Sequence, residues 1–172
     1  PIVQKRYVEL PSPTLEDNTP DLMRLEKHLG PLSVDIQLLR QLSGKMRRQS
    51  FKGTVVFSEN TLIDFEEGDT SSLCFGAAFD IGTTTIVGTL LNFCTAEEMA
   101  ITSRMNPQMR RGDDVLSRIR HSSESASSLQ ELHSLVIDEI NCMLDELVQQ
   151  AGIERNHIYD VIFAGNTTMQ HL

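Results

Sequence analysis

The sequence predicts an α/β protein in which a small α+β domain is followed by a half-domain built on a mixed sheet. Three observations lead to this prediction. Segments with the periodicity of strands and of amphipathic helices follow one another along most of the chain. A polar stretch at residues 68–72 separates two regions of different character. In the second region, two apolar strands enclose a glycine-threonine turn, and a long helix and a further strand follow.

The composition is typical of a globular protein that binds neither nucleic acid nor membrane. Of the 172 residues 40% are hydrophobic and only 5% aromatic, so aliphatic side chains must fill the core. A formal net charge of -9 repels a phosphate backbone, although a local pocket of N–H groups can still hold a nucleotide. No apolar run is long enough to span a bilayer. The three cysteines form no C-x-x-C pair, which indicates free thiols in a cytoplasmic location.

The first region is expected to contain the end of a linker, residues 1–14, and a small α+β domain, residues 15–72. The linker end is rich in proline and holds one strand at residues 2–10. Prolines in this part of the chain are Pro1, Pro11 and Pro13. The order Thr19-Pro20-Asp21 predicts a helix start, with Thr19 as the N-cap.

A second helix and a hairpin complete the expected small domain. Ser33 is expected to cap this helix, and its inward face is expected to carry Ile36, Leu39 and Leu42. The alternating apolar residues that follow predict a β-hairpin with strands at residues 53–57 and 61–65.

The second region, residues 73–172, is expected to be the half-domain. Strands are expected at residues 75–81, 85–93, 100–104 and 159–164, and helices at residues 113–120 and 129–150. In the first of these helices Val115, Leu116 and Ile119 share one side. The serine-rich residues 121–128 predict a mobile loop between the two helices.

The turn after the first of these strands carries residue types that bind phosphate. Its residues are Asp80, Ile81, Gly82, Thr83, Thr84 and Thr85. Gly82 allows the backbone to approach a ligand closely, and the threonines offer hydroxyl and N–H groups to anionic oxygens. Asp80, at the strand end, is suited to hold a hydrated Mg²⁺. The alternative is an ordinary hairpin with threonines on its exposed face.

A second polar segment follows the last expected strand. Its residues are Gly165, Asn166, Thr167 and Thr168, and it is expected at the same sheet edge as the threonine turn. Its amide and hydroxyl groups could reach a γ-phosphate or a catalytic water, whereas the alternative is simple helix capping. For residues 106–108 we favour a tight turn before a helix, and for Asp113 and Asp114 we favour helix capping.

The order of these elements is that of an actin-like or ribonuclease-H-like half-domain, and four stretches make the resemblance more specific. These are residues 5–17, the turn at residues 79–85, residues 106–119 with Asn-Pro-Gln and Gly-Asp-Asp-Val-Leu-Ser-Arg-Ile, and residues 164–172 with Ala-Gly-Asn-Thr-Thr-Met-Gln-His-Leu. With them the chain resembles the ATP-dependent reductive activators of corrinoid proteins, which belong to the acetate/sugar kinase, Hsp70 and actin superfamily.

The resemblance implies a longer parent protein that binds ATP and Mg²⁺ and carries a 2Fe-2S cluster in a ferredoxin domain outside this chain. This chain would supply the linker end, the middle domain and the first half of the ATPase-like domain. The implied activity drives low-potential electron transfer to the Co(II) form of a corrinoid protein or corrinoid-dependent methyltransferase system. The resemblance also allows a homodimer. The chain alone is expected neither to transfer electrons nor to hydrolyse ATP well.

Two alternatives remain open from the sequence. The chain could belong to a small-metabolite kinase of the same superfamily, which requires a base positioned for a substrate hydroxyl. It could also be a non-enzymatic docking or dimerisation module, a reading that suits the small first domain best.

Overall fold

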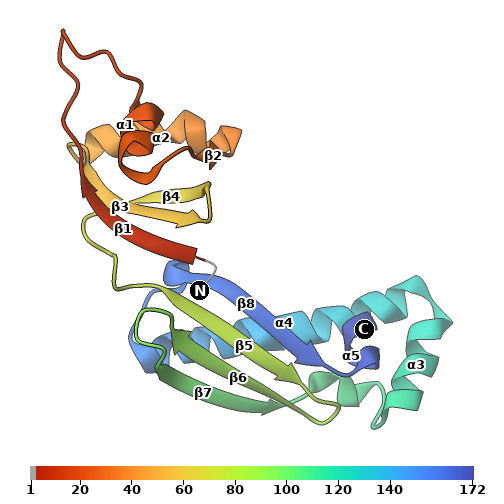
Figure 1. Ribbon diagram of the computed structural model, residues 1–172. Helices are drawn as coiled ribbons and strands as arrows, with labels where there is room; N and C mark the ends of the chain where they lie inside the picture. The colour runs from red at the N-terminus through yellow and green to blue at the C-terminus, as the bar shows by residue number, and fades with distance from the viewer. Residues whose placement is uncertain (1–2) are drawn as a thin grey trace. The chain divides into compact units, whose positions relative to one another are not determined.

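The computed structural model describes residues 3–172 and divides into two compact units, Pro1–Cys74 and Phe75–Leu172. Each unit contains its own four-stranded mixed sheet, with helices packed against it (Figure 1). The α/β class predicted from the sequence is therefore confirmed. The division falls two residues after the boundary expected at residue 72. In residues 3–172 no helix is long and apolar enough to cross a membrane.

The first unit packs two helices on one face of its sheet (Figure 1). The strand order is β1-β3-β4-β2, antiparallel except that β2 runs parallel to β4. The elements are β1 (Val3–Glu9), α1 (Asp21–Leu29), β2 (Ser33–Val34), α2 (Ile36–Arg48), β3 (Lys52–Ser58) and β4 (Thr61–Glu67). Since β1 pairs with β3 along its whole length, residues 3–9 of the expected linker end are a strand of this sheet.

Both helix starts in the first unit differ from the prediction. Thr19 does not cap α1, because its hydroxyl donates to Asp17 Oδ1 at 2.7 Å instead. Ser33 lies in β2, and the N-cap of α2 is Asp35, whose carboxylate accepts from Gln37 N. With this start, the buried face of α2 carries Leu42 and Met46, four residues apart, whereas the predicted inward residues Ile36 and Leu39 are exposed.

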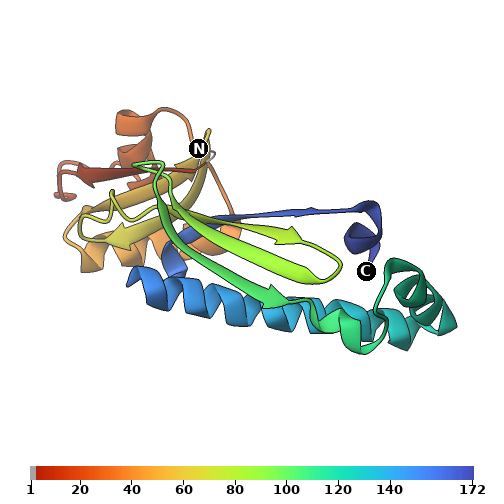
Figure 2. The same ribbon diagram turned by 90° about the horizontal axis from the view of Figure 1, so that it is seen from below.

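The second unit is a sheet with strand order β7-β6-β5-β8. Strands β5 (Phe75–Ile81), β6 (Thr85–Asn92) and β7 (Glu98–Met105) are antiparallel, and β8 (Ile158–Gly165) runs parallel to β5. The long helix α4 (Ala126–Ala151) lies along one face of the sheet (Figure 2). Its apolar side forms the core there: Leu132, Val136, Ile140, Met143, Leu144 and Leu147 are buried.

The expected mobile loop at residues 121–128 is wrong, because these serines belong to two helices. Helix α3 (Val115–Glu124) continues through Ser122 and Ser123, whose hydroxyls both donate to Ile119 O. Ser125 alone interrupts the helical conformation, and its side chain accepts from Ser128 N to cap α4. Serine hydroxyls that bond to nearby main chain explain why a serine-rich segment can end one helix and begin the next.

Candidate functional site

The threonine turn joins β5 to β6 in a tight loop. Gly82 N donates to Thr85 O at 2.9 Å, which closes the turn. A Cβ atom on Gly82 would lie 2.6 Å from Thr85 O, so the backbone can close in this way only without a side chain at that position. The strand–turn–strand arrangement expected from the sequence is confirmed.

The second polar segment reaches the same edge of the sheet. In the parallel pairing of β5 with β8, Asp80 is opposite Ala164 and Ile81 is opposite Gly165. Helix α5 (Thr167–His171) therefore begins beside the turn. A Cβ atom on Gly165 would meet Ile81 O at 3.2 Å, so glycine favours this close approach.

Asn166, Thr167 and Thr168 have structural surroundings of their own. The Asn166 side chain accepts from Met169 N at 3.1 Å, which is the helix-capping role. Thr167 and Thr168 line an apolar hollow of about 280 Å³ between α3, α4 and α5. The structure thus brings the segment to the turn, but part of the surface of these two threonines faces this hollow.

Three buried polar side chains lie behind the turn, where the sequence suggested no site. Asn106 and Gln108 are each 1% exposed and Arg118 is 0% exposed. Asn106 N donates to Thr84 O at 2.8 Å, and Asn106 Nδ2 donates to Gly82 O at 2.8 Å. Arg118 Nη2 donates to Thr83 O at 2.6 Å. Each carbonyl oxygen of the turn, from Gly82 to Thr84, therefore accepts a hydrogen bond from this cluster.

The same cluster connects the turn to the surrounding helices. Gln108 Nε2 donates to Leu132 O of α4 at 3.1 Å. Arg118 Nη1 lies 3.4 Å from Gln108 Oε1 and 3.7 Å from Met169 Sδ of α5. Arg118 Nε donates to Gly112 O at 2.9 Å. Because these contacts reach α3, α4 and α5, the turn is held by groups that come from widely separated parts of the chain.

The apolar side of α3 is not its buried side. Leu116 and Ile119, which share one side of this helix as predicted from the sequence, are 67% and 42% exposed. Residues 106–108, expected as a tight turn, begin a short 3-10 helix, η1 (Pro107–Arg110), with Asn106 as its cap. Asp114 caps α3 in a reciprocal capping box with Ser117, as favoured from the sequence.

The turn contains hydrogen-bond donors that an anion could use. In residues 3–172 no hydrogen bond is seen from Thr83 N, from Thr84 N or from the hydroxyls of Thr83, Thr84 and Thr85. Thr84, Thr85 and Asp80 are exposed. Successive N–H groups and hydroxyls without a partner are the kind of donors that bind phosphate oxygens. The turn can therefore accept a phosphate without breaking any hydrogen bond that these groups already make.

Asp80 offers a single carboxylate at the end of β5. The described residues contain no group of three or more histidine, cysteine, aspartate or glutamate side chains placed to hold a metal ion. One carboxylate beside a phosphate site still suits Mg²⁺, which keeps most of its water and takes further ligands from phosphate. Asp80 could thus hold a hydrated Mg²⁺ only together with a bound phosphate group.

Burial and two nearby acids affect the pKa of the Arg118 guanidinium, which lies behind the turn. Burial lowers the pKa of Arg118, and the negative charges of Asp113 and Asp114 oppose this change. The pKa of Asp114 is itself lowered, mainly because Ser117 N donates to its carboxylate. Arginine remains protonated at neutral pH even when its pKa falls, so a positive charge lies directly under the turn.

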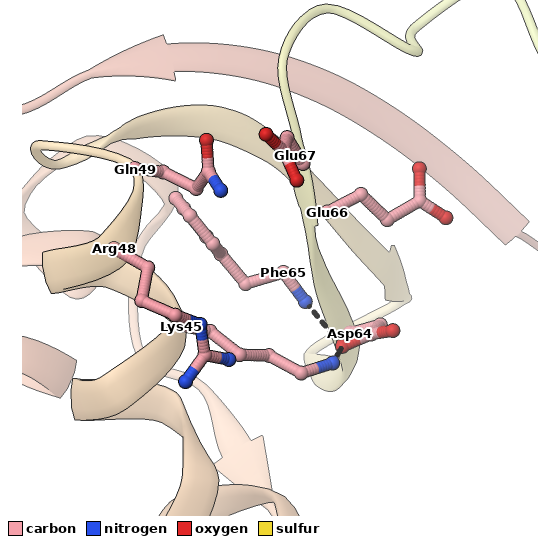
Figure 3. Close-up of a pocket in the computed structure, with 7 residues that line it drawn as sticks. All are labelled: Lys45, Arg48, Gln49, Asp64, Phe65, Glu66 and Glu67. Carbon is pink, nitrogen blue, oxygen red and sulfur yellow. Dashed lines mark hydrogen bonds and ion pairs between the residues drawn. The ribbon is translucent and has the colours of Figure 1, made fainter.

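Another hollow, of about 230 Å³, lies in the first unit between α2 and β4 (Figure 3). The side chains around it carry charges of both signs, and Lys45 forms an ion pair with Asp64. None of the site residues expected from the sequence lines it. The hollow therefore adds nothing to the candidate phosphate site, which lies wholly within the second unit.

Comparisons with known proteins identify the family. The family description "RACo linker region" matches residues 1–72, and "RACo middle region" matches residues 75–172. A relative, the corrinoid activation enzyme RamQ of Eubacterium limosum, is 33% identical over 119 residues, which are 69% of this chain and 20% of RamQ.

A solved structure described as a reductive activator for a corrinoid, iron-sulfur protein superposes with a TM-score of 0.84 at 33% identity. The match covers 99% of this chain and 29% of that protein. The chain thus spans between about a fifth and a third of the length of these relatives. On the match of both regions, this chain belongs to the RACo family.

Proposed function

We propose that the protein containing this chain binds ATP at the turn from Asp80 to Thr85 and uses it in the reductive activation of a corrinoid protein. The observation that carries this proposal is the hydrogen bonding of the turn. Its three carbonyl groups accept bonds from the buried cluster, whereas the N–H groups of Thr83 and Thr84 make no hydrogen bond within the described residues. The names of RamQ and of the reductive activator, to which the chain is similar, support the choice of corrinoid activation.

Each residue of the turn has a distinct part in the proposed binding. Thr83 and Thr84 would donate N–H and hydroxyl groups to phosphate oxygens, and Gly82 allows the turn to close. Asp80 would hold a hydrated Mg²⁺ against the same phosphates. Asn166, which lies at the same edge and already caps α5, would contribute its amide N–H groups.

ATP would act by changing the conformation of the activator and its corrinoid partner. Reduction of Co(II) to Co(I) is unfavourable at accessible potentials, so a second source of free energy must favour the reduced state. A ligand can shift a conformational equilibrium only through different affinities for the two states. The electron would come from a 2Fe-2S cluster outside this chain. The partner would be a corrinoid protein or a corrinoid-dependent methyltransferase system.

The proposal is tested by titrating ATP and Mg²⁺ into the full-length protein by calorimetry. We expect Asp80→Ala and Thr84→Ala each to weaken ATP binding about tenfold or more, because each removes a contact to a charged group. Thr95→Ala, at an exposed threonine between β6 and β7, serves as the matched control and should bind like the wild type. Unchanged affinity in both turn variants would contradict the proposed site.

A further inference from the structure

We propose that Arg118 is a positioning residue that holds the Gly82–Thr84 turn in the conformation that binds phosphate. This inference rests on the proposed function, because it assigns a role in the same ATP site. The sequence assigned no role to Arg118, and only the structure shows it under the turn.

The direction of the carbonyl groups decides whether such a turn attracts or repels an anion. A carbonyl oxygen carries partial negative charge, so a phosphate is stable only where these oxygens point away from it and the N–H groups point toward it. The middle carbonyl, that of Thr83, accepts a hydrogen bond from Arg118. The carbonyl of Thr84 accepts from the main-chain N–H of Asn106, and the carbonyl of Gly82 accepts from the Asn106 side chain. Loss of the middle contact would allow the Thr83–Thr84 peptide to rotate.

Arg118 uses separate nitrogens of its guanidinium for separate partners. Nη2 donates to Thr83 O at 2.6 Å and Nε donates to Gly112 O at 2.9 Å. The carbonyl of Gly112 lies just before α3, so one rigid planar group fixes the distance between the turn and the start of that helix. A lysine can replace the charge, but its single ammonium cannot reproduce two donors in fixed directions.

The charge of Arg118 is the second part of the argument. All four of its contacts are uncharged: Thr83 O, Gly112 O, Gln108 Oε1 and Met169 Sδ. Among the described residues it takes part in no ion pair within 4.0 Å. A fully buried cation without a direct carboxylate partner is unfavourable for folding alone. Asp113 and Asp114 act on Arg118 through space, without a direct contact. A phosphate bound on the outer side of the turn would add a further opposite charge, so the cation favours the phosphate-bound state.

The test compares ATP with adenosine, which shares the nucleoside but has no phosphate. Both are titrated by calorimetry into the full-length wild-type protein and into Arg118→Met, Arg118→Lys and Arg120→Met. Arg120 is exposed and lies on the same helix, so Arg120→Met makes the same change in charge away from the turn. For Arg118→Met we expect roughly a tenfold to hundredfold loss in ATP affinity and less than about a twofold change for adenosine.

The ATP affinity of Arg118→Lys should be several-fold weaker than that of the wild type, about midway between wild type and Arg118→Met. Lysine keeps the charge but cannot place two donors in fixed directions. Arg120→Met should bind both ligands like the wild type. Equal losses for ATP and adenosine would mean a general structural role and overturn the proposal. If circular dichroism shows that Arg118→Met does not fold, Arg118→Lys decides, and wild-type ATP affinity in that variant overturns the proposal.

The outcome also separates this inference from the proposed function. If the wild-type protein binds no ATP, the proposed function is wrong and the role of Arg118 is wrong with it. If the wild type binds ATP and Asp80→Ala weakens it, while Arg118→Met matches Arg120→Met, only the inference about Arg118 is overturned.

Discussion

At the scale of single residues, Gly82 and Gly44 show opposite uses of glycine. A Cβ atom on Gly82 would collide with Thr85 O at 2.6 Å, whereas on Gly44, inside α2, it would meet only the flexible end of Arg48 at 3.4 Å. We expect Gly82→Ala to open the turn and to weaken ATP binding by the full-length protein.

Gly44→Ala should instead stabilise the first unit by about 0.5–1 kcal/mol, since alanine favours the helix. Calorimetry and urea unfolding measure the two effects, and wild-type ATP affinity in Gly82→Ala would contradict this account.

Asp17 should make the first unit sensitive to acid. Its pKa is lowered, first by the Thr19 hydroxyl that donates to it and then by Arg24, which is 3% exposed. A folded-state pKa below the unfolded value of about 3.9 means that this contribution to stability is fully present above that pH. It decreases as the pH falls below this value and is lost once the pH has fallen through the lower folded-state pKa. We therefore expect the urea midpoint to fall more between pH 6 and about pH 3 in the wild type than in Asp17→Asn.

The exposed neighbour Glu16 provides the control for Asp17. Glu16→Gln removes a carboxylate from the same segment and should leave the acid dependence close to that of the wild type. If the urea midpoint of Asp17→Asn still falls as steeply at acid pH as that of the wild type, other carboxylates dominate the acid response of the first unit.

Residue-scale predictions from the sequence succeeded where a role depends on neighbours along the chain. The cap Asp114 and the turn-forming Gly82 are examples, because the atoms they contact lie within a few residues. Arg118 was missed because its main partner, Thr83, is 35 residues away, and no local pattern encodes that contact. Thr19 failed as a cap because Asp17 competes for its hydroxyl.

At the scale of elements, the two helices that follow the turn differ in how much of their surface is core. In α4, Leu147 is 0% exposed, whereas in α3, Leu116 is 67% exposed. We expect Leu147→Ala to destabilise the second unit by about 2–5 kcal/mol, because it leaves a cavity against the sheet. Leu116→Ala should change stability by no more than about 0.5 kcal/mol. Urea unfolding followed by circular dichroism compares the two variants. A large loss of stability in Leu116→Ala would show that this side of α3 is part of the core.

The strands were easier to predict than the helix faces. Apolar runs bounded by turn residues placed β5 and β8 to within a residue or two. Burial explains the apolar run only for β5, which lies between two strands. The run in β8 does not reflect burial, because β8 is an edge strand in which Ile162 and Phe163 are exposed. Helix faces depend on which turn of the helix meets the sheet. In α3 the polar cluster under the threonine turn fills the inner side, so the apolar side of the helix is not its buried side.

At the scale of the whole molecule, each unit has its own core. In the first, ten buried apolar side chains pack together between α1, α2 and the sheet. In the second, the apolar side of α4 fills this role. The polar break near residue 70 indicated such a division, because a change from amphipathic to continuously apolar strands marks a change of core. The sequence could not indicate that β1 belongs to the first sheet, since its pairing with β3 spans about fifty residues.

If ATP binds at the turn as proposed, the chain supplies one side of the nucleotide site, so we expect residues 1–172 alone to bind ATP at least a hundredfold more weakly than the full-length protein. Ligand pockets that enclose a nucleotide-sized molecule measure about 300–1,000 Å³. The hollow next to Asp80, lined mostly by apolar side chains of β5, β6 and β8, measures about 180 Å³. The turn can thus hold phosphates, while most of the base and ribose would remain in water.

Calorimetry with ATP and Mg²⁺ on both proteins tests this expectation, with Asp80→Ala in each to show that the same site is measured. A sub-micromolar Kd for residues 1–172 would mean that the described residues already enclose the nucleotide, and the account of the turn as a single wall would then be wrong.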